Sequence, residues 1–310
     1  MTTAIDLLIV GGGAAGLTAG LYATRSRLDA VLLERMGPGG QLVNVDRVEN
    51  YPGFPEGIAG HELGPLMAQQ AMDAGLAFEY GEARALRPGA GEDGRHVIET
   101  DGETFAARAV ILAGGSALAR LGVPGEAEFE GRGVSYCATC DGEFFRDQPV
   151  VVVGGGDSAL DEALYLAEIA SSVTIVHRRL SFRAARIAQE RILAQPRCRV
   201  LWETTVRAIL GDDAVNAVEL SGPEGEKRLV AAGVFVYVGL NPNTAWLHGA
   251  VELDGGGHVI ADGRLQTSVP GVFAAGDLRQ FSARQVASCV GDGATAAIWA
   301  ERFLRGADAR

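Results

Sequence analysis

The chain has 310 residues, with 27 Lys and Arg against 39 Asp and Glu, so its net charge at neutral pH is −12. This length is sufficient for two domains, each with its own core. The acidic balance argues against nucleic acid or an anionic membrane as a partner, and no apolar run approaches the ~20 residues that a membrane span needs. No signal-peptide core is evident either, so we expect a cytoplasmic protein.

The first predicted strand, over 5–10, ends in a glycine-rich loop. The loop is Gly11-Gly12-Gly13-Ala14-Ala15-Gly16, followed by a predicted helix over 14–25 and a second strand over 30–33. A strand, glycine turn and helix in this order bind a dinucleotide pyrophosphate, because backbone N–H groups at the helix start face the phosphates. Glu34 ends the second strand, where a carboxylate accepts hydrogen bonds from free ribose hydroxyls.

The chain after Glu34 alternates between loops and regular elements. Glycine and proline dominate 36–41, and the prolines of 49–55 exclude a continuous helix or a central strand there. We predict a helix over 60–74, short alternating stretches as far as 105, and a buried strand over 110–113 that ends at Gly114. The loop at 88–103 has no recognisable motif. Near 116 the chain is expected to leave its first domain.

A pair of cysteines at close spacing comes next. Cys137 and Cys140 are separated by two residues and followed directly by Asp141. In a reducing compartment such a pair is half of a metal site or a redox centre, and two buried structural cysteines are the plainer alternative. We predict no metal, because no second cysteine pair is present and the five histidines are scattered. A dithiol transfers electrons when one thiolate attacks and the other resolves the mixed disulfide, and an adjacent carboxylate can move the proton.

The remaining cysteines, Cys198 and Cys289, stand alone. Four cysteines in a chain of this length do not make a framework of structural disulfides. An isolated cysteine usually behaves as a small apolar core residue. We therefore predict that neither of these two thiols takes part in the chemistry.

A second glycine loop follows the predicted strand over 149–153. It is Gly154-Gly155-Gly156-Asp157-Ser158-Ala159, with a helix predicted over 158–170 and a strand over 172–176. This strand ends in His177-Arg178-Arg179, and Arg183 follows. The alternative is a solvated turn, but a cationic cluster at the position equivalent to Glu34 favours a nucleotide 2′-phosphate. The chain is therefore predicted to bind two different dinucleotides, the second being NADPH.

The last third of the chain predicts a helix over 184–194, a strand over 234–239 and a strand beginning at 271. Gly276-Asp277 ends this last strand, which we expect to rejoin the first domain. There Asp277 would accept from the ribityl chain of a flavin rather than only close a turn, with Arg284-Gln285 nearby. The predicted fold class is α/β, with two dinucleotide-binding three-layer domains, each a parallel sheet with helices on its faces, one inserted into the other.

These residues together resemble low-molecular-weight bacterial thioredoxin reductase over nearly the whole chain. The chain departs from the family pattern at Gly114, where a threonine often stands beside the flavin. The matching stretches are Gly39-Gly40-Gln41-Leu42, Val48-Glu49-Asn50-Tyr51-Pro52-Gly53, residues 131–142, the second glycine loop with His177-Arg178-Arg179, and 271–277 with Arg284-Gln285.

The resemblance implies a homodimer with FAD in a split domain (1–116 and 246–310) and NADPH in the inserted domain (117–245). Hydride would pass from NADPH to the flavin, and the reduced flavin would reduce the cysteine pair. Cys140 would face the flavin, Cys137 would attack the thioredoxin disulfide, and Asp141 would act as acid and base. The inserted domain would rotate between the two half-reactions. Around FAD the family would place Gly11, Gly13, Ala14, Ala15, Gly16, Glu34, Gly40, Gln41, Leu42, Asn50, Ala113, Gly114, Gly276, Asp277, Arg284 and Gln285.

Three other functions remain open at this point. A reductase of another disulfide carrier would share every motif. A flavin dithiol oxidase that passes electrons to oxygen would share the fold and the cysteine pair, although Arg178 and Arg179 count against it because it needs no NADPH. A nucleotide-sensing binding module would not need Asp141 beside an intact dithiol.

Overall fold

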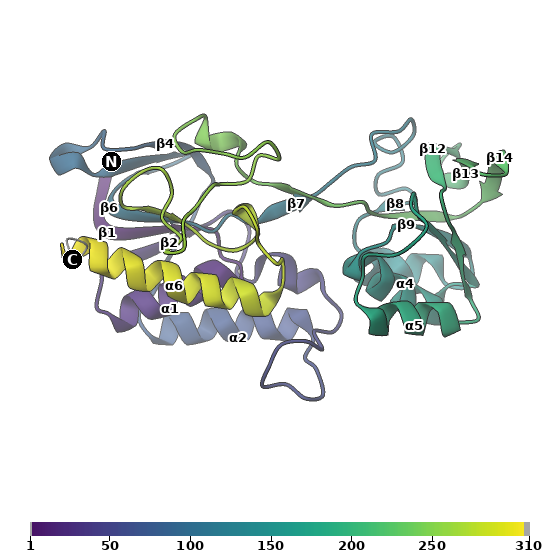
Figure 1. Cartoon of the computed structure of the whole chain (residues 1–310), viewed down its shortest axis with the longest axis horizontal. Helices are drawn as coiled ribbons and strands as arrows, with labels where there is room; N and C mark the ends of the chain where they lie inside the picture. The colour runs from purple at the N-terminus through teal and green to yellow at the C-terminus, as the bar shows by residue number, and fades with distance from the viewer. Residues whose placement is uncertain (1, 307–310) are drawn as a thin grey trace. The chain divides into compact units, whose positions relative to one another are not determined.

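The computed structural model describes residues 2–306, and the chain divides into two compact units. The split unit contains the residues up to Ala117 and those from Asn241 onward, and the inserted unit is Leu118–Leu240. Figure 1 shows the elements of each unit in the colours of the chain order.

The chain returns to the split unit at Asn241, earlier than the predicted start at 246. The reason lies in the hydrogen bonds of the returning segment. Strand β16 (Leu240–Pro242) pairs with β7 (Ser116–Leu118), and the Asn243 side-chain amide donates to the Gly114 carbonyl at 2.9 Å. These contacts already hold the returning chain against the segment that left the split unit, at positions before residue 246.

The split unit is built on a seven-stranded mixed sheet. Its long central strands β1 and β6 run parallel, and the second half of β6 also pairs in parallel with β17. Strands β4 and β5 are antiparallel, with β5 paired to the first half of β6. The prediction of a purely parallel sheet is therefore wrong at this edge. The strands are β1 (Thr2–Val10), β2 (Ala30–Glu34), β3 (Ala77–Tyr80), β4 (Ala83–Arg87), β5 (His96–Thr100), β6 (Thr104–Leu112) and β17 (Val272–Ala274).

Helices cover one face of this sheet (Figure 1). Alternate residues of β6 point to opposite faces. Ala109 and Ile111 join the core shared with the helices, whereas Val110 and Leu112 join a second core covered by residues 247–278. The helices are α1 (Ala14–Arg25), α2 (Gly60–Asp73) and α6 (Val286–Leu304), with short 3-10 helices η1 (Gly40–Asn44), η2 (Glu92–Gly94), η4 (Ala245–Leu247) and η5 (Gly276–Leu278).

The inserted unit has a five-stranded parallel sheet in the order β11-β10-β9-β15-β8. The run Val150–Val153 in its central strand predicts burial on both faces, and all four valines are buried. The strands are β8 (Val134–Ser135), β9 (Pro149–Gly154), β10 (Ser172–Val176), β11 (Cys198–Leu201) and β15 (Gly233–Tyr237), and the helices are α3 (Ala138–Asp141), η3 (Gly142–Phe145), α4 (Asp157–Ile169) and α5 (Arg186–Ala194).

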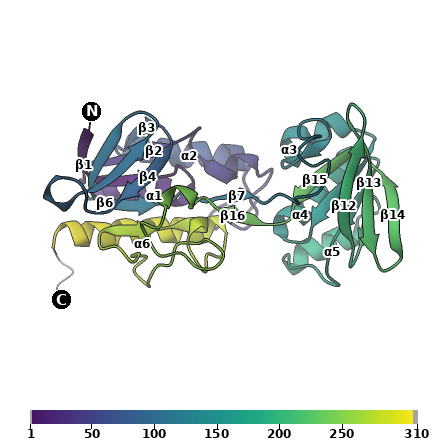
Figure 2. The same cartoon turned by 90° about the horizontal axis from the view of Figure 1, so that it is seen from above.

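The two faces of this sheet are covered differently. Val150 and Val152 pack with α4 and α5, whereas Val151 and Val153 pack against a separate antiparallel sheet. That sheet consists of β12 (Thr205–Gly211), β13 (Val215–Gly222) and β14 (Gly225–Val230), and Figure 2 shows it beside the parallel strands. Helices on both faces were predicted here, so the third layer is a correction: the alternating pattern of 205–230 forms two hairpins.

None of the helices within residues 2–306 combines the length and apolarity needed to cross a bilayer.

Candidate active site

The first glycine loop lies between β1 and α1 of the split unit. Gly11 has φ +110°, and a Cβ there would overlap the carbonyl oxygen of Ala113. A Cβ on Gly16 would overlap the carbonyl oxygen of Gly11, so glycine is required where the helix leaves the turn. The loop therefore brings the ends of β1 and β6 together, with Ala113 and Gly114 against Gly11.

The start of α1 fits a pyrophosphate. Gly13 is the N-cap residue, no side chain within the described residues caps it, and a Cβ built on it would meet no atom within 4 Å. Ala14 and Ala15 follow as the first helical residues. Gly40 lies on the same loop, since a Cβ there would be 3.0 Å from the Cα of Gly13. The first N–H groups of a helix need external partners, and an anion at this position satisfies them.

Glu34 lies next to the loop, as the sequence predicts. Its Oε2 accepts from the Gly12 amide at 2.6 Å and its Oε1 from the Met36 amide at 2.9 Å. A carboxylate has about four lone-pair positions, so acceptor capacity remains for ribose hydroxyls. A cavity of about 500 Å³ opens here, lined by Gly11, Glu34, Gly114, Asn243, Trp246 and other residues of the split unit.

The other predicted FAD residues of the first segment lie around the same loop. Gln41 donates its side-chain amide to the Ser116 carbonyl at 3.0 Å. Leu42 is buried and packs with Ala14. Asn50 donates to the Gln285 side-chain oxygen at 2.9 Å, which joins residues from the two ends of the chain. The structure thus brings together residues that are far apart in the sequence.

The Gly276–Asp277 turn follows β17. Asp277 Oδ1 accepts from Ser282 Oγ at 3.2 Å and from Cys289 Sγ at 3.4 Å. Burial and the Asp277 carboxylate raise the pKa of the Cys289 thiol, which keeps it protonated at neutral pH. A Cβ on Gly276 would lie 3.0 Å from Ala15. The turn therefore meets the first glycine loop, and the strand before it rejoins the first domain, as predicted.

Sequence reasoning missed the side chain that holds this turn. Asp292, 8 % exposed, accepts from the Gly276 amide at 3.0 Å and pairs with Arg279 at 2.6 Å. A carboxylate within the otherwise uncharged stretch 286–300 of helix α6 is the signal that could have drawn attention to it, because a buried charge requires a partner.

Arg284 and Gln285 differ in what they contact. Arg284 has φ +56° and directs its guanidinium to His258, with Nη2 3.1 Å from Nε2. Gln285 is the N-cap of α6 and closes a capping box with Ser288. Within the described contacts, Gln285 is the member of the pair that touches another predicted FAD residue, Asn50.

The second glycine loop repeats the geometry of the first one. Gly154 has φ +155°, and a Cβ there would overlap the carbonyl oxygen of Tyr237 at the end of β15. Gly156 is the N-cap of α4, without a side-chain cap in the described chain. Ser158 is exposed in the first turn and Ala159 is buried. The Asp157 carboxylate accepts from the Ala185 amide at 2.6 Å, which fixes the start of α5 beside the loop.

The predicted phosphate cluster divides into one buried ring and three exposed arginines. His177 is 6 % exposed, its Nε2 lies 2.9 Å from the Ser181 carbonyl oxygen, and its ring packs on Phe182 at 5.5 Å. Arg178, Arg179 and Arg183 are exposed. The Arg183 amide donates to the Gly155 carbonyl at 2.8 Å, which places this residue beside the glycine loop. The buried His177 ring therefore supports the glycine loop, and the three exposed arginines carry the positive charge that can reach a ligand.

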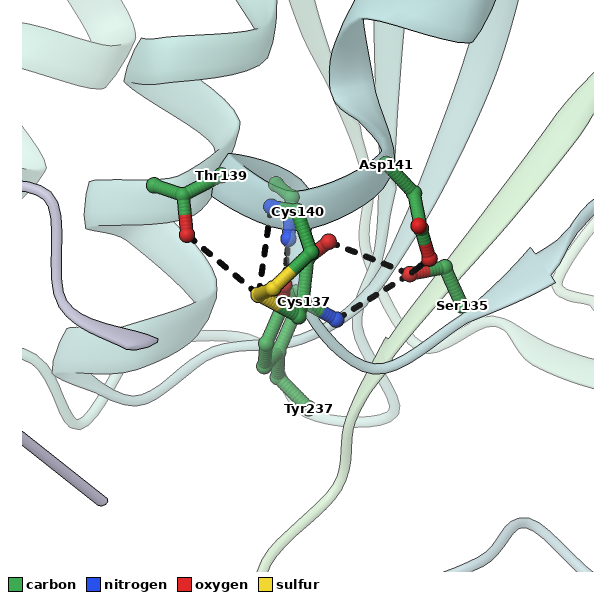
Figure 3. The surroundings of a disulfide bond; sticks show 7 residues. Ser135, Cys137, Thr139, Cys140, Asp141 and Tyr237 are labelled. Carbon is green, nitrogen blue, oxygen red and sulfur yellow. Dashed lines mark hydrogen bonds between the residues drawn. A yellow bond between two sulfur atoms is a disulfide. The ribbon is translucent and has the colours of Figure 1, made fainter. Parts of the chain in front are cut away.

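Cys137 and Cys140 form a disulfide bond at the start of α3 (Figure 3). Cys137 is the N-cap residue, and its Sγ accepts from the Cys140 amide at 3.2 Å and lies 3.3 Å from Thr139 Oγ1. Cys137 is half-buried and Cys140 is exposed. Two polar groups therefore point at the Cys137 sulfur, where a thiolate would form on reduction.

Asp141 reaches the cysteine turn through a serine. Ser135 Oγ donates to the Asp141 carboxylate at 2.7 Å and accepts from the Cys137 amide at 3.1 Å. Figure 3 shows Ser135 between the two residues. Ser135 was not predicted as a site residue. Its position two residues before the first cysteine, at the end of a short strand, is the signal that could have found it.

This geometry defines a class of protein: two dinucleotide sites and a redox disulfide in one chain. The family model described as "Pyridine nucleotide-disulphide oxidoreductase" matches residues 5–293. The chain belongs to this family.

Proteins named thioredoxin reductase are among its relatives. One from Mycolicibacterium smegmatis is 46 % identical over 97 % of both chains, and one from Listeria innocua is 42 % identical over 96 % of this chain and 93 % of its own. The crystal structure of Lactococcus lactis thioredoxin reductase in its FR conformation has a TM-score of 0.94 at 40 % identity, and covers 97 % of this chain and 99 % of that one. The T. acidophilum enzyme has a TM-score of 0.92 at 36 % identity, and covers 98 % and 99 %. The predicted resemblance is confirmed.

Proposed function

We propose that this protein is an NADPH-dependent flavoprotein disulfide reductase that reduces thioredoxin through FAD and the Cys137–Cys140 pair. The observation that carries the proposal is the disulfide itself, exposed at Cys140 and located in a chain with two uncapped glycine-loop helices. The two loops differ in charge at the equivalent strand end, with Glu34 in one and Arg178-Arg179 in the other. This difference supports a separate nucleotide for each loop.

The residues present fit both cofactors. When bound, NADPH supplies a hydride and FAD passes the electron pair to a disulfide. In the split unit, the first glycine loop, Glu34 and the Gly276–Asp277 turn would hold FAD, with Gly40, Gln41, Leu42, Asn50, Ala113, Gly114, Arg284 and Gln285 around them. In the inserted unit, the residues proposed to hold NADPH are Gly154, Gly156, Asp157, Ser158, Ala159, His177, Arg178, Arg179 and Arg183.

The cysteines would carry the electrons to the partner. Reduction of the disulfide by two electrons and two protons gives two thiols. The Cys137 thiolate attacks the partner disulfide and forms a mixed disulfide, which releases one partner thiol. Cys140 then attacks Cys137, so the intramolecular disulfide forms again and the partner leaves as a dithiol. The Cys140 amide and Thr139 stabilise the attacking Cys137 thiolate, and Asp141 acts as acid and base.

We also propose that the protein is a cytoplasmic homodimer. The family resemblance supports a dimer, and light scattering on the purified protein tests it: a monomer mass at micromolar concentration would contradict it. A cytoplasmic location agrees with a cysteine pair that must be reduced again in every turnover, because thiols are kept reduced in the cytoplasm. Cell fractionation with an antibody against the chain tests the location.

The decisive experiment mixes the purified protein anaerobically with NADPH and follows the flavin absorbance, then adds oxidised thioredoxin. We expect rapid bleaching, followed by return of the colour as thioredoxin thiols form. A flavin that NADPH does not bleach would exclude the proposal. Turnover with oxygen but not with thioredoxin would instead identify a dithiol oxidase.

A Cys140→Ser variant separates the two half-reactions. NADPH should still bleach its flavin, because that step needs no cysteine, whereas thioredoxin reduction should be lost. A Cys198→Ser variant is the matched control, since burial raises the pKa of Cys198 to about 11 and this thiol stays protonated. Wild-type turnover in Cys140→Ser would show that the electrons take another route.

A further inference from the structure

A tyrosine lies directly beneath the cysteine turn. Tyr237 is the last residue of β15 and is 8 % exposed. Its hydroxyl accepts a hydrogen bond from the Ala138 amide at 2.9 Å, and Figure 3 shows the phenol under the disulfide. Ala138 follows Cys137 in the chain and begins α3. The phenol therefore satisfies one of the first N–H groups of this helix, which have no intrahelical acceptor.

The Tyr237 hydroxyl is also hydrogen-bonded to Glu162 on α4. Burial raises the pKa of Tyr237 above its ordinary value, and the negative charge and hydrogen bond of Glu162 raise it further. The phenol is thus neutral at physiological pH and retains its proton for Glu162. The resulting chain of bonds has one direction: Ala138 N–H donates to the phenol, and the phenol donates to the carboxylate.

Ser135, which precedes Cys137 in the sequence, also holds the cysteine turn by hydrogen bonds. It holds the Cys137 amide and the Asp141 carboxylate. While the disulfide is intact, the S–S bond itself closes the turn. After reduction that covalent link is lost, and only hydrogen bonds fix the positions of the two thiols.

We propose that Tyr237 and Glu162 are positioning residues that hold the turn closed in the dithiol state, so that the two sulfurs remain within bonding distance. The equilibrium of a dithiol with its disulfide depends on the effective concentration of one thiol near the other. A loosened turn lowers this concentration and makes the disulfide less stable. The inference rests on the proposed function because the pair must cycle between both states, but its test uses neither NADPH nor thioredoxin.

The test equilibrates the protein with mixtures of reduced and oxidised glutathione, in which two glutathione thiols reduce one protein disulfide. Alkylation followed by mass spectrometry gives the fraction of the Cys137–Cys140 pair that is reduced. In Tyr237→Phe we expect the equilibrium to shift about three- to tenfold toward the dithiol, as the loss of one hydrogen bond implies. A tenfold shift corresponds to ~30 mV in reduction potential.

Tyr136→Phe is the matched control. Tyr136 is next to Cys137 on the other side and also hydrogen-bonds a glutamate, but its hydroxyl donates to Glu126 at 2.9 Å, away from the turn. We expect its dithiol equilibrium to match that of the wild type. Glu162→Gln retains an acceptor for the phenol and should also stay near wild type, whereas Glu162→Leu should shift in the same direction as Tyr237→Phe.

Two results would overturn the proposal: an unchanged equilibrium in Tyr237→Phe, or an equal shift in Tyr136→Phe. If Tyr237→Phe does not fold, the comparison of Glu162→Gln with Glu162→Leu decides, since equal equilibria in these two variants would reject it. Failure of the proposed function is seen separately. A wild-type flavin that NADPH does not bleach refutes the reductase, whatever the glutathione equilibrium shows.

Discussion

At the scale of single residues, the two dinucleotide loops differ most in charge. The Glu34 carboxylate accepts hydrogen bonds from two backbone amides beside its own loop, which uses part of its acceptor capacity. Arg178 and Arg179 are exposed, and no described ion pair within residues 2–306 involves either guanidinium. Side chains that already have charged partners are poor phosphate ligands, because an incoming anion must displace those partners. Among the residues that the structure describes, the two exposed arginines have no such competitor.

Removal of these arginines should erode the preference for NADPH. Each charged hydrogen bond that is lost costs about 1.5–3 kcal/mol, so kcat/KM for NADPH should fall roughly ten- to a hundredfold in Arg178→Ala and in Arg179→Ala. The value for NADH should change little. Arg207→Ala, an exposed arginine of β12 in the same unit, is the control. An unchanged ratio of the two kcat/KM values would reject the phosphate assignment.

A second residue-scale effect concerns the buried His96 at the start of β5, which is 6 % exposed. Burial lowers its pKa below the ordinary value of 6.5, only partly opposed by the bond to the Pro270 carbonyl. The Gly89 amide points at Nδ1 at 3.4 Å, which suits a neutral ring. Below pH 6.5 the unfolded chain therefore binds a proton that the folded chain resists.

The stability of the split unit should accordingly fall as the pH drops below about 6.5, by at most ~1.4 kcal/mol per pH unit from this group. Urea unfolding between pH ~7.5 and ~5.5 measures the effect. His96→Gln should flatten this dependence, and His61→Gln, at an exposed position of α2, should not. Equal pH dependence in His96→Gln and wild type would contradict the assignment to His96.

At the scale of elements, α1 and α6 approach each other through a glycine. A Cβ on Gly293 of α6 would overlap the backbone carbonyl of Ala15 in α1. Backbone cannot move aside as a flexible side chain can. Gly291 lies on the same helix, but a Cβ there would meet no atom within 4 Å.

The two glycines should therefore respond to alanine in opposite ways. Gly293→Ala should destabilise the protein by about 1–3 kcal/mol through overpacking. Gly291→Ala should stabilise it by about 0.5–1 kcal/mol, because alanine restricts the unfolded chain and favours helix. Thermal unfolding of both variants measures the difference. A similar loss of Tm in both would mean that helix propensity, not the contact with Ala15, sets the response.

The sequence predicted most elements that line the dinucleotide sites. The helix over 14–25 and the strand over 172–176 are confirmed residue for residue, because glycine turns and apolar runs mark their ends. The second sheet of the inserted unit was missed, because the strands of 205–230 alternate with polar residues and carry no motif. Contacts between distant segments were also beyond reach: nothing local in Asp292 or Tyr237 indicates that one holds Gly276 and the other Ala138.

At the scale of the whole molecule, the inserted unit has cores of its own. Both of its hydrophobic clusters draw only on residues between Leu121 and Val238. The core of the split unit needs both of its segments, because β17 and α6 come from the second segment and pack on β6 and α1 of the first. Where the chain leaves and re-enters the split unit, the Asn243 backbone amide donates to the Gly115 carbonyl at 3.0 Å, so the two connecting segments are neighbours.

A fragment of residues 118–240 should therefore fold alone. We expect cooperative thermal unfolding by circular dichroism and a ligand-induced rise in Tm with NADP⁺. A fragment that stops at Val230 lacks strand β15, which pairs with both β9 and β8, and should remain unfolded. Noncooperative melting of the 118–240 fragment would show that its stability depends on the split unit.

Because the split unit consists of two segments separated by the inserted unit, the two units cannot finish folding in the order in which they begin synthesis. When the ribosome has finished residue 240, the inserted unit has all its strands, but the first segment still lacks the strand and helix that close it. Until the final 70 residues emerge, one edge of β6 and one side of α1 in the nascent first segment remain uncovered. Chaperone contact and FAD uptake should both be concentrated in that last interval of translation.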